Sequence, residues 1–425
     1  MLFLRFPNLV EAFLNDPPKI YFIACCFPPF GRGNSITNFC VANGLSKHFN
    51  VDVVSMEREE GGIIAYHEDA GLEEAVSQKI KVHRIRAARW WEINVLLYVT
   101  GILPCYFINW AWSVWRRRDD IFGQKGVIFT VYPVFSDLLV GYLISRRYKM
   151  PLLVDFRDDF SGVMASGWRR RLGWYYRFFE KNIVRRADKI TVTTEELRKD
   201  LIERYGVANE KVKVVYNIVP TASRGRQNGS DVLNKPLRVI YAGAMSSIQK
   251  PEILLSAYAN LQTDIPDLKE RLIVEFYGPN SPYFRLRIRK NFIDGCQYGG
   301  FLPQAQIAEK VFAADIGFFS LSGATYSYAT PTKLFDYIEA GVPILASLPK
   351  GAARHIIESF GIGLVADVGD VAGLSEKLSI LAENEDLRNQ FKKNMKDARR
   401  EFNAQKQIEK FQEVLNVMNT DYKSD

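Results

Sequence analysis

Short apolar runs alternate with amphipathic stretches along the first half of the chain. The amphipathic stretches, such as Ser35 to Phe49, have the periodicity of helices. The runs between them have the length of buried strands; they are KIYFIACC from Lys19, VDVVSM from Val51, GVIFTVY from Gly126, PLLVDF from Pro151 and KITVTT from Lys189. Strands that alternate with helices form a parallel sheet covered on both faces. The pattern therefore predicts a doubly wound, Rossmann-like α/β domain.

A second series of the same kind follows a polar segment. Between Pro220 and Pro236 the sequence TASRGRQNGSDVLNK is rich in Gly, Ser, Asn and Arg, as expected of a linker. Beyond it we predict strands at LRVIYAG, RLIVEFYG, DIGFFSL, VPILAS and GLVADV, and terminal amphipathic helices. The predicted domains are 1–220 and 221–405, with a helix over 406–425 that packs back on the N-terminal domain. Two such domains would face each other across a cleft at the carboxyl ends of their sheets, where ligands bind.

Composition narrows the class of protein. The 425 residues are 47% apolar and 24% charged, ordinary values that exclude a disordered, collagenous or coiled-coil chain. The five cysteines lack metal or disulfide spacing and histidines number only four, so we expect no zinc enzyme and a reducing, cytosolic environment. The first residues, up to Lys19, lack the basic start, apolar run and cleavage site of a signal peptide, and none is predicted.

The net charge of +8 is concentrated in one aromatic-rich stretch. Trp168 to Lys189 holds eight Lys or Arg, two Asp or Glu and six aromatic residues. As one helix it would bury an apolar stripe and present arginines bordered by Trp174 and Tyr175, which suits an anionic membrane surface. A solvated basic face is the alternative. A nucleic-acid partner is disfavoured, because no RNA-binding motif or basic tail accompanies the stretch.

An uncharged stretch of 23 residues, from Ile93 to Trp115, is long enough to span a bilayer. Asn94, Gly101 and Pro104 interrupt it, and predicted strands of one sheet lie on both sides of it. A connection within one sheet cannot leave through a membrane. We therefore expect buried or interfacial helices there instead of a span.

The densest chemical signal is the segment ATPTKLFDYIEAGVP, which ends at Pro343. Thr330 or Thr332 is expected to cap a helix that has Pro331 in its first turn and ends at Gly341. A helix N-terminus suits a phosphate, and a first-turn cation such as Lys333 opposes the helix dipole unless an anion binds there. Glu339, near the far end, is predicted to accept hydrogen bonds from sugar hydroxyls. A capped helix with a surface Lys and Glu is the alternative.

In the other domain, Asp155-Phe-Arg-Asp158 stands at the end of the strand PLLVDF. Carboxylates at the carboxyl end of a strand face the cleft, and Asp158 is the predicted base that takes a proton from a hydroxyl. Arg157 is predicted to hold a phosphate or to orient Asp158. A local Asp–Arg pair that caps the next helix is the alternative, with Asp155 as its structural member.

The loop after the first strand, FPPFGRGN, is not a G-x-G-x-x-G motif, and no acidic residue ends the strand VDVVSM. Dinucleotide binding is therefore disfavoured. Gly31 and Gly33, with Arg32 between them, would let the backbone approach a phosphate or an acceptor, and a plain tight turn is the alternative.

Several of these segments, taken in order, resemble GT-B glycosyltransferases, particularly family 4 and related bacterial polysaccharide glycosyltransferases. The resemblance extends from about Lys19 to the C-terminus and includes the segment around Lys333, the loop from Pro28 to Asn34, and Asn217 at the end of the N-terminal domain. It continues through the motifs YAGAM with Gly243, the later Lys250, YGP with Gly278, and GFLP with Phe301. Asp-x-Arg-Asp resembles an acceptor-site motif of several GT-B branches.

The resemblance implies roles for these residues. The C-terminal domain would bind a UDP-, GDP- or TDP-sugar through Gly243, Lys250, Gly278, Phe301, Thr332, Lys333 and Glu339, and the N-terminal domain would bind the acceptor, with no metal and no cofactor. The chain departs from family 4 in three places: Pro331 stands at the first position of Glu-x7-Glu, Ala244 where many members carry a phosphate-binding arginine, and Ile-Val follows Asn217. Lys250 and Lys333 would then be the cations that neutralise the diphosphate. We expect a divergent member whose stereochemistry, retaining in family 4, does not simply carry over.

The implied function is transfer of a sugar to a glycan or polyprenyl-linked glycan in cell-surface polysaccharide biosynthesis. The protein would be cytoplasmic and peripheral on the inner face of the plasma membrane. Two alternatives stay open: a sugar-nucleotide epimerase of the same fold, and a non-catalytic protein of polysaccharide assembly.

Overall fold

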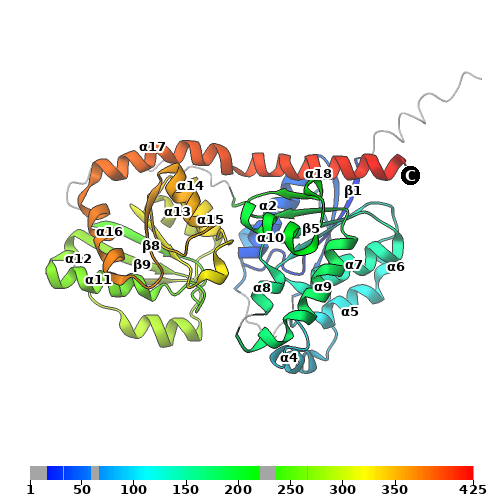
Figure 1. The fold of residues 1–425 in the computed structure, drawn as a ribbon, viewed down its shortest axis with the longest axis horizontal. Coiled ribbons are helices and arrows are strands. Elements are labelled where there is room, and N and C mark those ends of the chain that lie inside the picture. The colour runs from blue at the N-terminus through cyan, green and yellow to red at the C-terminus, as the bar shows by residue number, and fades with distance from the viewer. Residues whose placement is uncertain are drawn as a thin grey trace, which may run out of the picture.

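The computed structural model describes residues 17–31, 33–58, 67–165, 167–220, 236–265 and 267–424. Within these ranges the chain forms two domains, each built on one parallel sheet that helices cover (Figure 1). This confirms the prediction of two doubly wound, Rossmann-like domains. The predicted linker at 221–235 lies outside the described residues, and the predicted domain limits stay predictions.

The N-terminal sheet has the strand order β3-β2-β1-β4-β5-β6-β7, and every neighbouring pair is parallel. Its strand order reverses between β1 and β4, so the loops that leave these strands diverge and leave room for a ligand at their carboxyl ends. The strands are β1 (Lys19–Ile23), β2 (Asn50–Met56), β3 (Lys81–Ile85), β4 (Val127–Tyr132), β5 (Leu152–Phe156), β6 (Lys189–Val192) and β7 (Val212–Val214). The helices are α2 (Gly33–Leu45), α3 (Ala70–Glu74), α4 (Trp91–Val99), α5 (Ile108–Arg116), α6 (Arg118–Ile121), α7 (Phe135–Tyr148), α8 (Phe160–Met164), α9 (Gly173–Arg186) and α10 (Glu195–Tyr205).

The C-terminal sheet repeats this plan with the order β10-β9-β8-β11-β12-β13, again all parallel. The reversal here lies between β8 and β11. The strands are β8 (Leu237–Ala242), β9 (Leu272–Tyr277), β10 (Cys296–Gly300), β11 (Ile316–Ser320), β12 (Ile344–Ser347) and β13 (Gly363–Ala366). The helices are α11 (Glu252–Asp264), α12 (Leu268–Arg271), α13 (Gln304–Phe312), α14 (Thr332–Ala340), α15 (Ala352–Phe360), α16 (Val371–Glu383), α17 (Glu385–Phe402) and α18 (Ala404–Ser424).

Three strands were not predicted from apolar runs: β3, β7 and β10. All three lie at the edge of their sheet. An edge strand has a neighbour on one side only, so it needs fewer apolar residues, and β10 (CQYGG) is polar and rich in glycine.

The prediction of one helix over Trp168 to Lys189 is wrong. The arginine run lies in a separate 3-10 helix, η1 (Gly167–Leu172), α9 begins only at Gly173, and Lys189 already belongs to β6. Gly167 and Gly173 explain why the helix is interrupted, because glycine is a poor helix former and Gly167 has a positive φ of 59°. The uncharged stretch from Ile93 to Trp115 is also divided, between α4 and α5, and no helix in the described ranges is long and apolar enough to cross a membrane.

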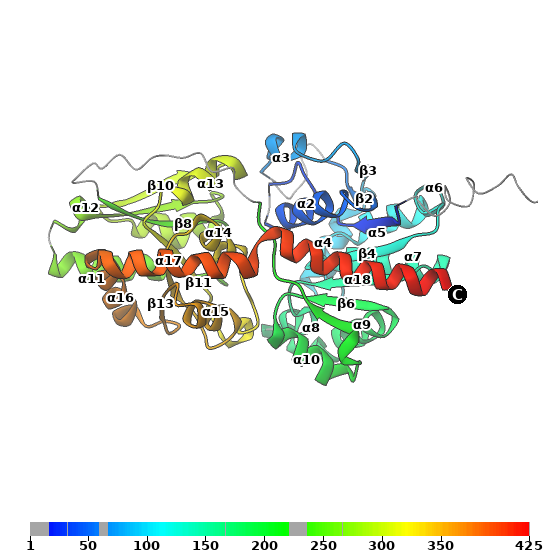
Figure 2. The same ribbon diagram turned by 90° about the horizontal axis from the view of Figure 1, so that it is seen from above.

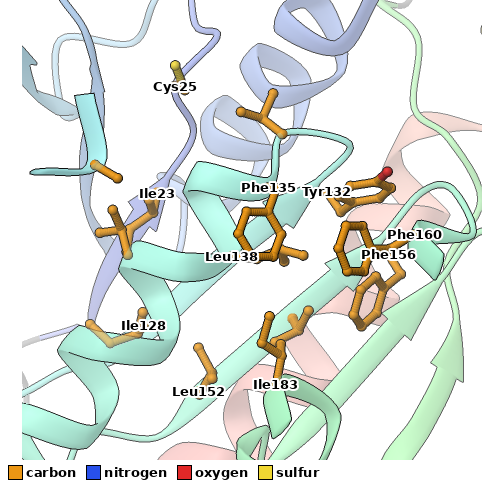
Figure 3. Packing of buried hydrophobic residues seen from close by; sticks show 14 of the residues in the cluster. Ile23, Cys25, Ile128, Tyr132, Phe135, Leu138, Leu152, Phe156, Phe160 and Ile183 are labelled. Carbon is orange, nitrogen blue, oxygen red and sulfur yellow. The ribbon is translucent and has the colours of Figure 1, made fainter. Parts of the chain in front are cut away.

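The core of the N-terminal domain fixes the end of β5. Figure 3 shows Tyr132, Phe135, Phe156 and Phe160 gathered beside β4 and β5. The rings of Phe135 and Phe160 stack at 5.2 Å, and Phe160 is fully buried. Because Phe160 begins α8 directly after Asp159, this packing holds the loop that carries Asp158.

The last two helices cross from one domain to the other. α17 packs on the C-terminal domain, and α18 lies across α2 and β4 of the N-terminal domain (Figures 1 and 2). Phe411 of α18 is 2% exposed, and its ring lies 5.4 Å from that of Phe129 in β4. At Gly44 of α2 the approach is so close that a Cβ would lie 2.5 Å from Ile408.

Truncation of this contact should destabilise the N-terminal domain. We expect Phe411→Ala to lower the free energy of unfolding by about 3–5 kcal/mol, the usual result of deleting a buried aromatic ring. Val417→Ala, at a position of α18 that is 48% exposed, is the matched control and should change it by less than about 0.5 kcal/mol. Denaturant unfolding measures both, and equal small effects would show that α18 does not contribute to this core.

Candidate functional site

The carboxyl ends of the two sheets contact each other across the domain boundary. Phe301, just after β10, stacks on His67 of the N-terminal domain with ring centres 4.4 Å apart. A Cβ placed on Gly31 would lie 3.0 Å from the same phenyl ring, and one placed on Gly33 would lie 3.9 Å from Thr332 Oγ1. The loop after β1 therefore lies against both β10 and the start of α14.

Lys333 has its ammonium group buried under the end of β8. The residue is 7% exposed, and its Nζ lies 5.0 Å from the centre of the Tyr241 ring. Gly243 has a φ of 129°, and a Cβ there would come within 2.9 Å of Nζ, so glycine provides both the conformation and the space. Burial lowers the pKa of Lys333 to about 8, although the nearby Asp336 opposes the shift. A cation held at a helix N-terminus favours an anionic ligand.

The start of α14 differs from the prediction. Pro331 is the N-cap itself, not a first-turn residue, and in the described ranges no side chain caps the helix. Thr330 is buried, and its hydroxyl oxygen has no hydrogen-bond partner among the residues that the structure describes. The Thr330 carbonyl accepts from Asn217 Nδ2 (2.9 Å), which ties the end of the N-terminal domain to this helix. Gly341 ends α14 with a φ of 73°, as predicted. The N-terminus of α14 therefore keeps backbone donors that no side chain of the described residues satisfies.

Two acidic residues of α14 face different surroundings. Asp336, one turn after Lys333, lies close enough to Lys333 and to Cys40 of α2 to affect the pKa of both, which places it at the domain boundary. Burial raises the pKa of Asp336 to about 7. The carboxylate of Glu339 instead lies 3.9 Å from Arg399 Nε of α17. Asp336 therefore lies beside Lys333, and the role of Glu339 as a donor ligand stays a prediction.

The glycines at the ends of β8, β9 and β10 form a linked row. The Gly243 N–H donates to the Tyr277 carbonyl, and the Gly278 N–H donates to the Gly300 carbonyl, both at 2.9 Å. A Cβ on Gly278, whose φ is 153°, would lie 2.1 Å from the Gly243 carbonyl oxygen. This row keeps side chains away from the carboxyl edge of the sheet. Lys250 is exposed just before α11, with a φ of 35°.

Asp158 and Arg157 lie together at the end of β5. Arg157 is 8% exposed; its Nε donates to Asp155 (2.8 Å) and its Nη1 donates to Asn38 Oδ1 of α2 (2.9 Å). Its Nη2 is buried and has no hydrogen-bond partner within the described part of the chain. The predicted Asp155–Arg157 pair therefore exists, but it does not cap the next helix, since Asp159 does so by accepting from the Gly162 N–H. A buried guanidinium with one unused donor can bind a further anionic or carbonyl group.

The pKa of Asp158 is raised to about 7, chiefly by burial, while Arg157 opposes the shift and Asp159 adds to it. Tyr328, from the loop before α14, lies near enough that the negative charge of Asp158 raises the tyrosine pKa beyond the effect of burial. Asp158 therefore faces the C-terminal domain with a carboxyl group that changes protonation near neutral pH. This is the behaviour that general acid–base chemistry requires.

Asp69 joins the two domains by a different contact. Its Oδ1 accepts from the Leu72 N–H (3.1 Å) at the start of α3, and its Oδ2 accepts from the Gln304 N–H (2.6 Å) at the start of α13. The Gly31 N–H donates to the His67 carbonyl (2.8 Å), so the same segment holds the loop after β1. Arg32 lies outside the described residues.

The predicted residues fall into two groups. Contacts link one group at the domain boundary or beside Lys333, which holds Lys333, Thr332, Gly243, Gly278, Phe301, Gly31 and Gly33, with Arg157 and Asp158 at the end of β5. In the second group, Lys250 is exposed and Glu339 pairs with Arg399. The sequence reasoning missed Asp336, Asn38, Asp69 and Tyr328. Only Asp336 had a local signal, its three-residue spacing from Lys333 on a helix. In the described ranges no group of His, Cys, Asp and Glu is arranged to hold a metal ion.

Comparison with known families divides the chain as the fold does. The sequence profile described as "Glycosyl transferase 4-like domain" matches residues 42–217, and the one described as "Glycosyl transferases group 1" matches residues 226–398.

Curated relatives include D-inositol 3-phosphate glycosyltransferases. The one from Streptomyces scabiei is 26% identical over 309 residues, which cover 67% of this chain and 65% of the relative. The one from Streptomyces bingchenggensis is 34% identical over 189 residues, 41% of this chain and 39% of the relative. The matched part of this chain thus spans less than two thirds of these relatives.

Solved structures share the fold over nearly the whole chain. WaaG, a glycosyltransferase involved in lipopolysaccharide biosynthesis, has a TM-score of 0.65 at 16% identity and covers 93% of this chain and 99% of its own. HepE from Anabaena, in complex with UDP-glucose, has a TM-score of 0.65 at 15% identity; the match covers 94% of this chain and 100% of the HepE chain. The N-terminal domain of trehalose-6-phosphate phosphatase from Candida albicans has a TM-score of 0.70 at 10% identity. The match covers 94% of this chain and 97% of that domain.

The raised pKa values of Asp158 and Asp336 predict how stability depends on pH. Both carboxyls bind protons more tightly in the folded chain, where their pKa is about 7, than in the unfolded chain, where it is ordinarily about 4. The free energy of unfolding should therefore fall as the pH rises from about 4 to about 7. Asp158→Asn and Asp336→Asn cannot ionise, so each should stabilise the protein more at pH 8 than at pH 5, by at least about 1 kcal/mol. Denaturant unfolding at both pH values tests this, with the exposed Asp397→Asn as control, and a gain that is independent of pH would contradict it.

Proposed function

Because the chain belongs to the GT-B glycosyltransferases as a divergent member, we propose that it transfers a sugar from a nucleoside-diphosphate donor to an acceptor hydroxyl. The observation that carries this proposal is the buried ammonium of Lys333 at the uncapped N-terminus of α14, on the boundary that Asp158 reaches from the other domain. A cation and free helix N–H groups on one side and a titratable carboxyl on the other are what such a transfer needs.

The C-terminal domain would hold the donor. As the bond between sugar and diphosphate breaks, negative charge grows on the leaving phosphate, and fixed positive charge there lowers the barrier. Lys333 and the first N–H groups of α14 would supply it without rearrangement, because packing against Gly243 and Tyr241 already fixes the lysine. The glycine row at Gly243 and Gly278 would let the diphosphate approach the backbone. Lys250 is a further donor contact that we propose.

The N-terminal domain would activate the acceptor. Asp158 has a pKa of about 7, so near neutral pH it can be ionised before the reaction and still be basic enough to take a proton from a hydroxyl. Arg157 is fixed by Asp155 and Asn38 and would offer its remaining buried Nη2 donor to the acceptor.

The acceptor we propose is a glycan or polyprenyl-linked glycan of cell-surface polysaccharide biosynthesis, met at the cytoplasmic face of the plasma membrane. UDP is the first donor nucleotide to test, because the related fold of HepE binds UDP-glucose. A second candidate acceptor is a phosphorylated cyclitol. It is supported by relatives named for D-inositol 3-phosphate and by the unused Arg157 donor, which could pair with a phosphate.

The reaction is tested by nucleotide release from UDP-, GDP- and TDP-sugars with each acceptor class. We expect Lys333→Ala to lower kcat/KM by about 100-fold or more, through lost charge on the leaving group. Asp158→Asn should lower it by about 100- to 10,000-fold, with little change in donor binding. The exposed Lys350→Ala is the matched control and should keep wild-type activity.

Other outcomes would identify the alternatives. A folded protein that binds no nucleotide by calorimetry would favour the non-catalytic assembly protein. Conversion of the sugar nucleotide without any acceptor would favour the epimerase.

The position of the two α14 carboxylates makes a separate prediction. Asp336 lies on the Lys333 side and would accept hydrogen bonds from the donor, whereas Glu339 pairs with Arg399. We expect Asp336→Asn to weaken nucleotide binding about tenfold or more, the effect of losing a charged hydrogen-bond acceptor. Glu339→Gln should change it less than about threefold. Titration calorimetry with UDP measures both variants. A larger loss of UDP affinity in Glu339→Gln than in Asp336→Asn would identify Glu339 as the donor ligand instead.

A further inference from the structure

One surface of the N-terminal domain carries large apolar side chains that no part of the described chain covers. They come from α4 with the turn after it and from the start of α9; we call them the apolar face, and they are Ile93, Leu96, Val99, Ile102, Trp174 and Phe178. Trp174 is 73% exposed, Leu96 63% and Phe178 60%. In Figure 1 α4 lies at the side of the domain opposite to α17 and α18.

α4 exposes apolar residues and buries Asn94, unlike a helix that faces water. Its exposed apolar residues Ile93, Leu96 and Val99 follow one another at three-residue spacing, so they share one side. Asn94 is fully buried, and its side chain donates to the Tyr106 carbonyl (3.1 Å). A helix that buries an asparagine and exposes three apolar residues is matched to an apolar environment on its outer side.

Specific contacts hold the two parts of the apolar face together. The hydroxyl of Tyr175 donates to the Ile102 carbonyl (2.8 Å), and that of Tyr176 donates to the Gly101 carbonyl (2.7 Å). Arg169 of η1 donates to the Tyr98 carbonyl (2.6 Å), and its guanidinium lies 4.2 Å from the centre of the Tyr98 ring. The side chains are therefore exposed on a well-connected surface and not on a loose loop.

Positive charge borders the apolar face. Arg170 and Arg171 are exposed in η1, three to four residues before Trp174, and Arg177 is exposed on α9. The acidic residue of α9, Glu180, is buried and pairs with Arg204, so it does not offset this charge; Glu92 of α4 is exposed. Aromatic and aliphatic side chains flanked by arginines match an anionic bilayer, with rings at the headgroup level and guanidinium groups at the phosphates.

We propose that the apolar face docks the protein on an anionic lipid bilayer, with Trp174 and Phe178 of α9 and Leu96 and Val99 of α4 entering the headgroup region. Aliphatic residues favour this partner over a single-stranded nucleic acid, which would stack on aromatic rings alone. The inference rests on the proposed function only for its consequence: η1 follows Asp158 by nine residues, so docking would bring the candidate base close to a membrane-borne acceptor.

Vesicle flotation tests the proposal on the full-length protein. Phosphatidylcholine vesicles are compared with vesicles that contain 30% phosphatidylglycerol, a composition chosen for the assay. We expect the wild type to bind the anionic vesicles selectively. Arg170→Gln/Arg171→Gln should weaken binding roughly 30-fold, the effect of two charges near an anionic surface. Trp174→Ser/Phe178→Ser should weaken it at least about tenfold by removing inserted rings.

Matched controls come from the rest of the surface. Lys392→Gln/Lys393→Gln removes two adjacent exposed charges of α17, and Leu286→Ser removes a side chain that is 64% exposed in the C-terminal domain. Both should bind vesicles as the wild type does. The proposal would be overturned if the wild type did not bind anionic vesicles, or if the control variants lost binding as much as the apolar-face variants. It would also be overturned if the apolar-face variants lost affinity only for a single-stranded oligonucleotide. Nucleotide binding by calorimetry in solution, without vesicles, reports on the glycosyltransferase function separately and should be unchanged in all of these variants.

Discussion

The candidate site depends on the buried ammonium group of Lys333. Removing a charge from water costs free energy unless opposite charge or hydrogen bonds compensate, and here the compensation from Asp336 is incomplete, because burial shifts the pKa of both groups toward neutrality. The uncapped α14 adds positive potential at the same point. An anionic ligand would relieve this imbalance. The glycine at 243, which leaves space for the lysine, and the tie from Asn217 to Thr330 both serve to keep this arrangement in place.

The N-terminal domain supports its half of the boundary by different means. A dry aromatic cluster around Phe160 holds the loop of Asp158, and a chain of hydrogen bonds through Asp155 and Asn38 holds Arg157. The site thus combines a charge fixed by packing on one domain with a carboxyl group whose protonation changes near neutral pH on the other. In the function that we propose, each half is incomplete alone, so sugar transfer would depend on the relative position of the two domains.

The sequence predicts the features that depend on residues close together along the chain. Buried strands were recognised as apolar runs, and Lys333 was recognised because a helix N-terminus and its first-turn cation are adjacent in sequence. The edge strands β3, β7 and β10 were missed, because one-sided burial leaves a weak apolar signal. Glu339 pairs with Arg399, 60 residues later, and the contact of Asp69 with Gln304 joins residues 235 positions apart. Such pairings follow from tertiary packing, which a single sequence does not display.

The chain passes between the domains twice at nearly the same place. Tyr216, on the first passage, packs its ring against Phe402 at the end of α17 (4.8 Å), and its N–H donates to Gln407 of α18 (3.1 Å). Because the two passages lie side by side, we expect the domains to separate by rotation about this line. Rotation that parts Gly31 from Phe301 to admit a ligand would also take Asp69 from the start of α13. In the proposed reaction, exchange of product for donor would therefore break the hydrogen bond between Asp69 and the start of α13, at a cost in free energy. Closure of the domains would form this bond again.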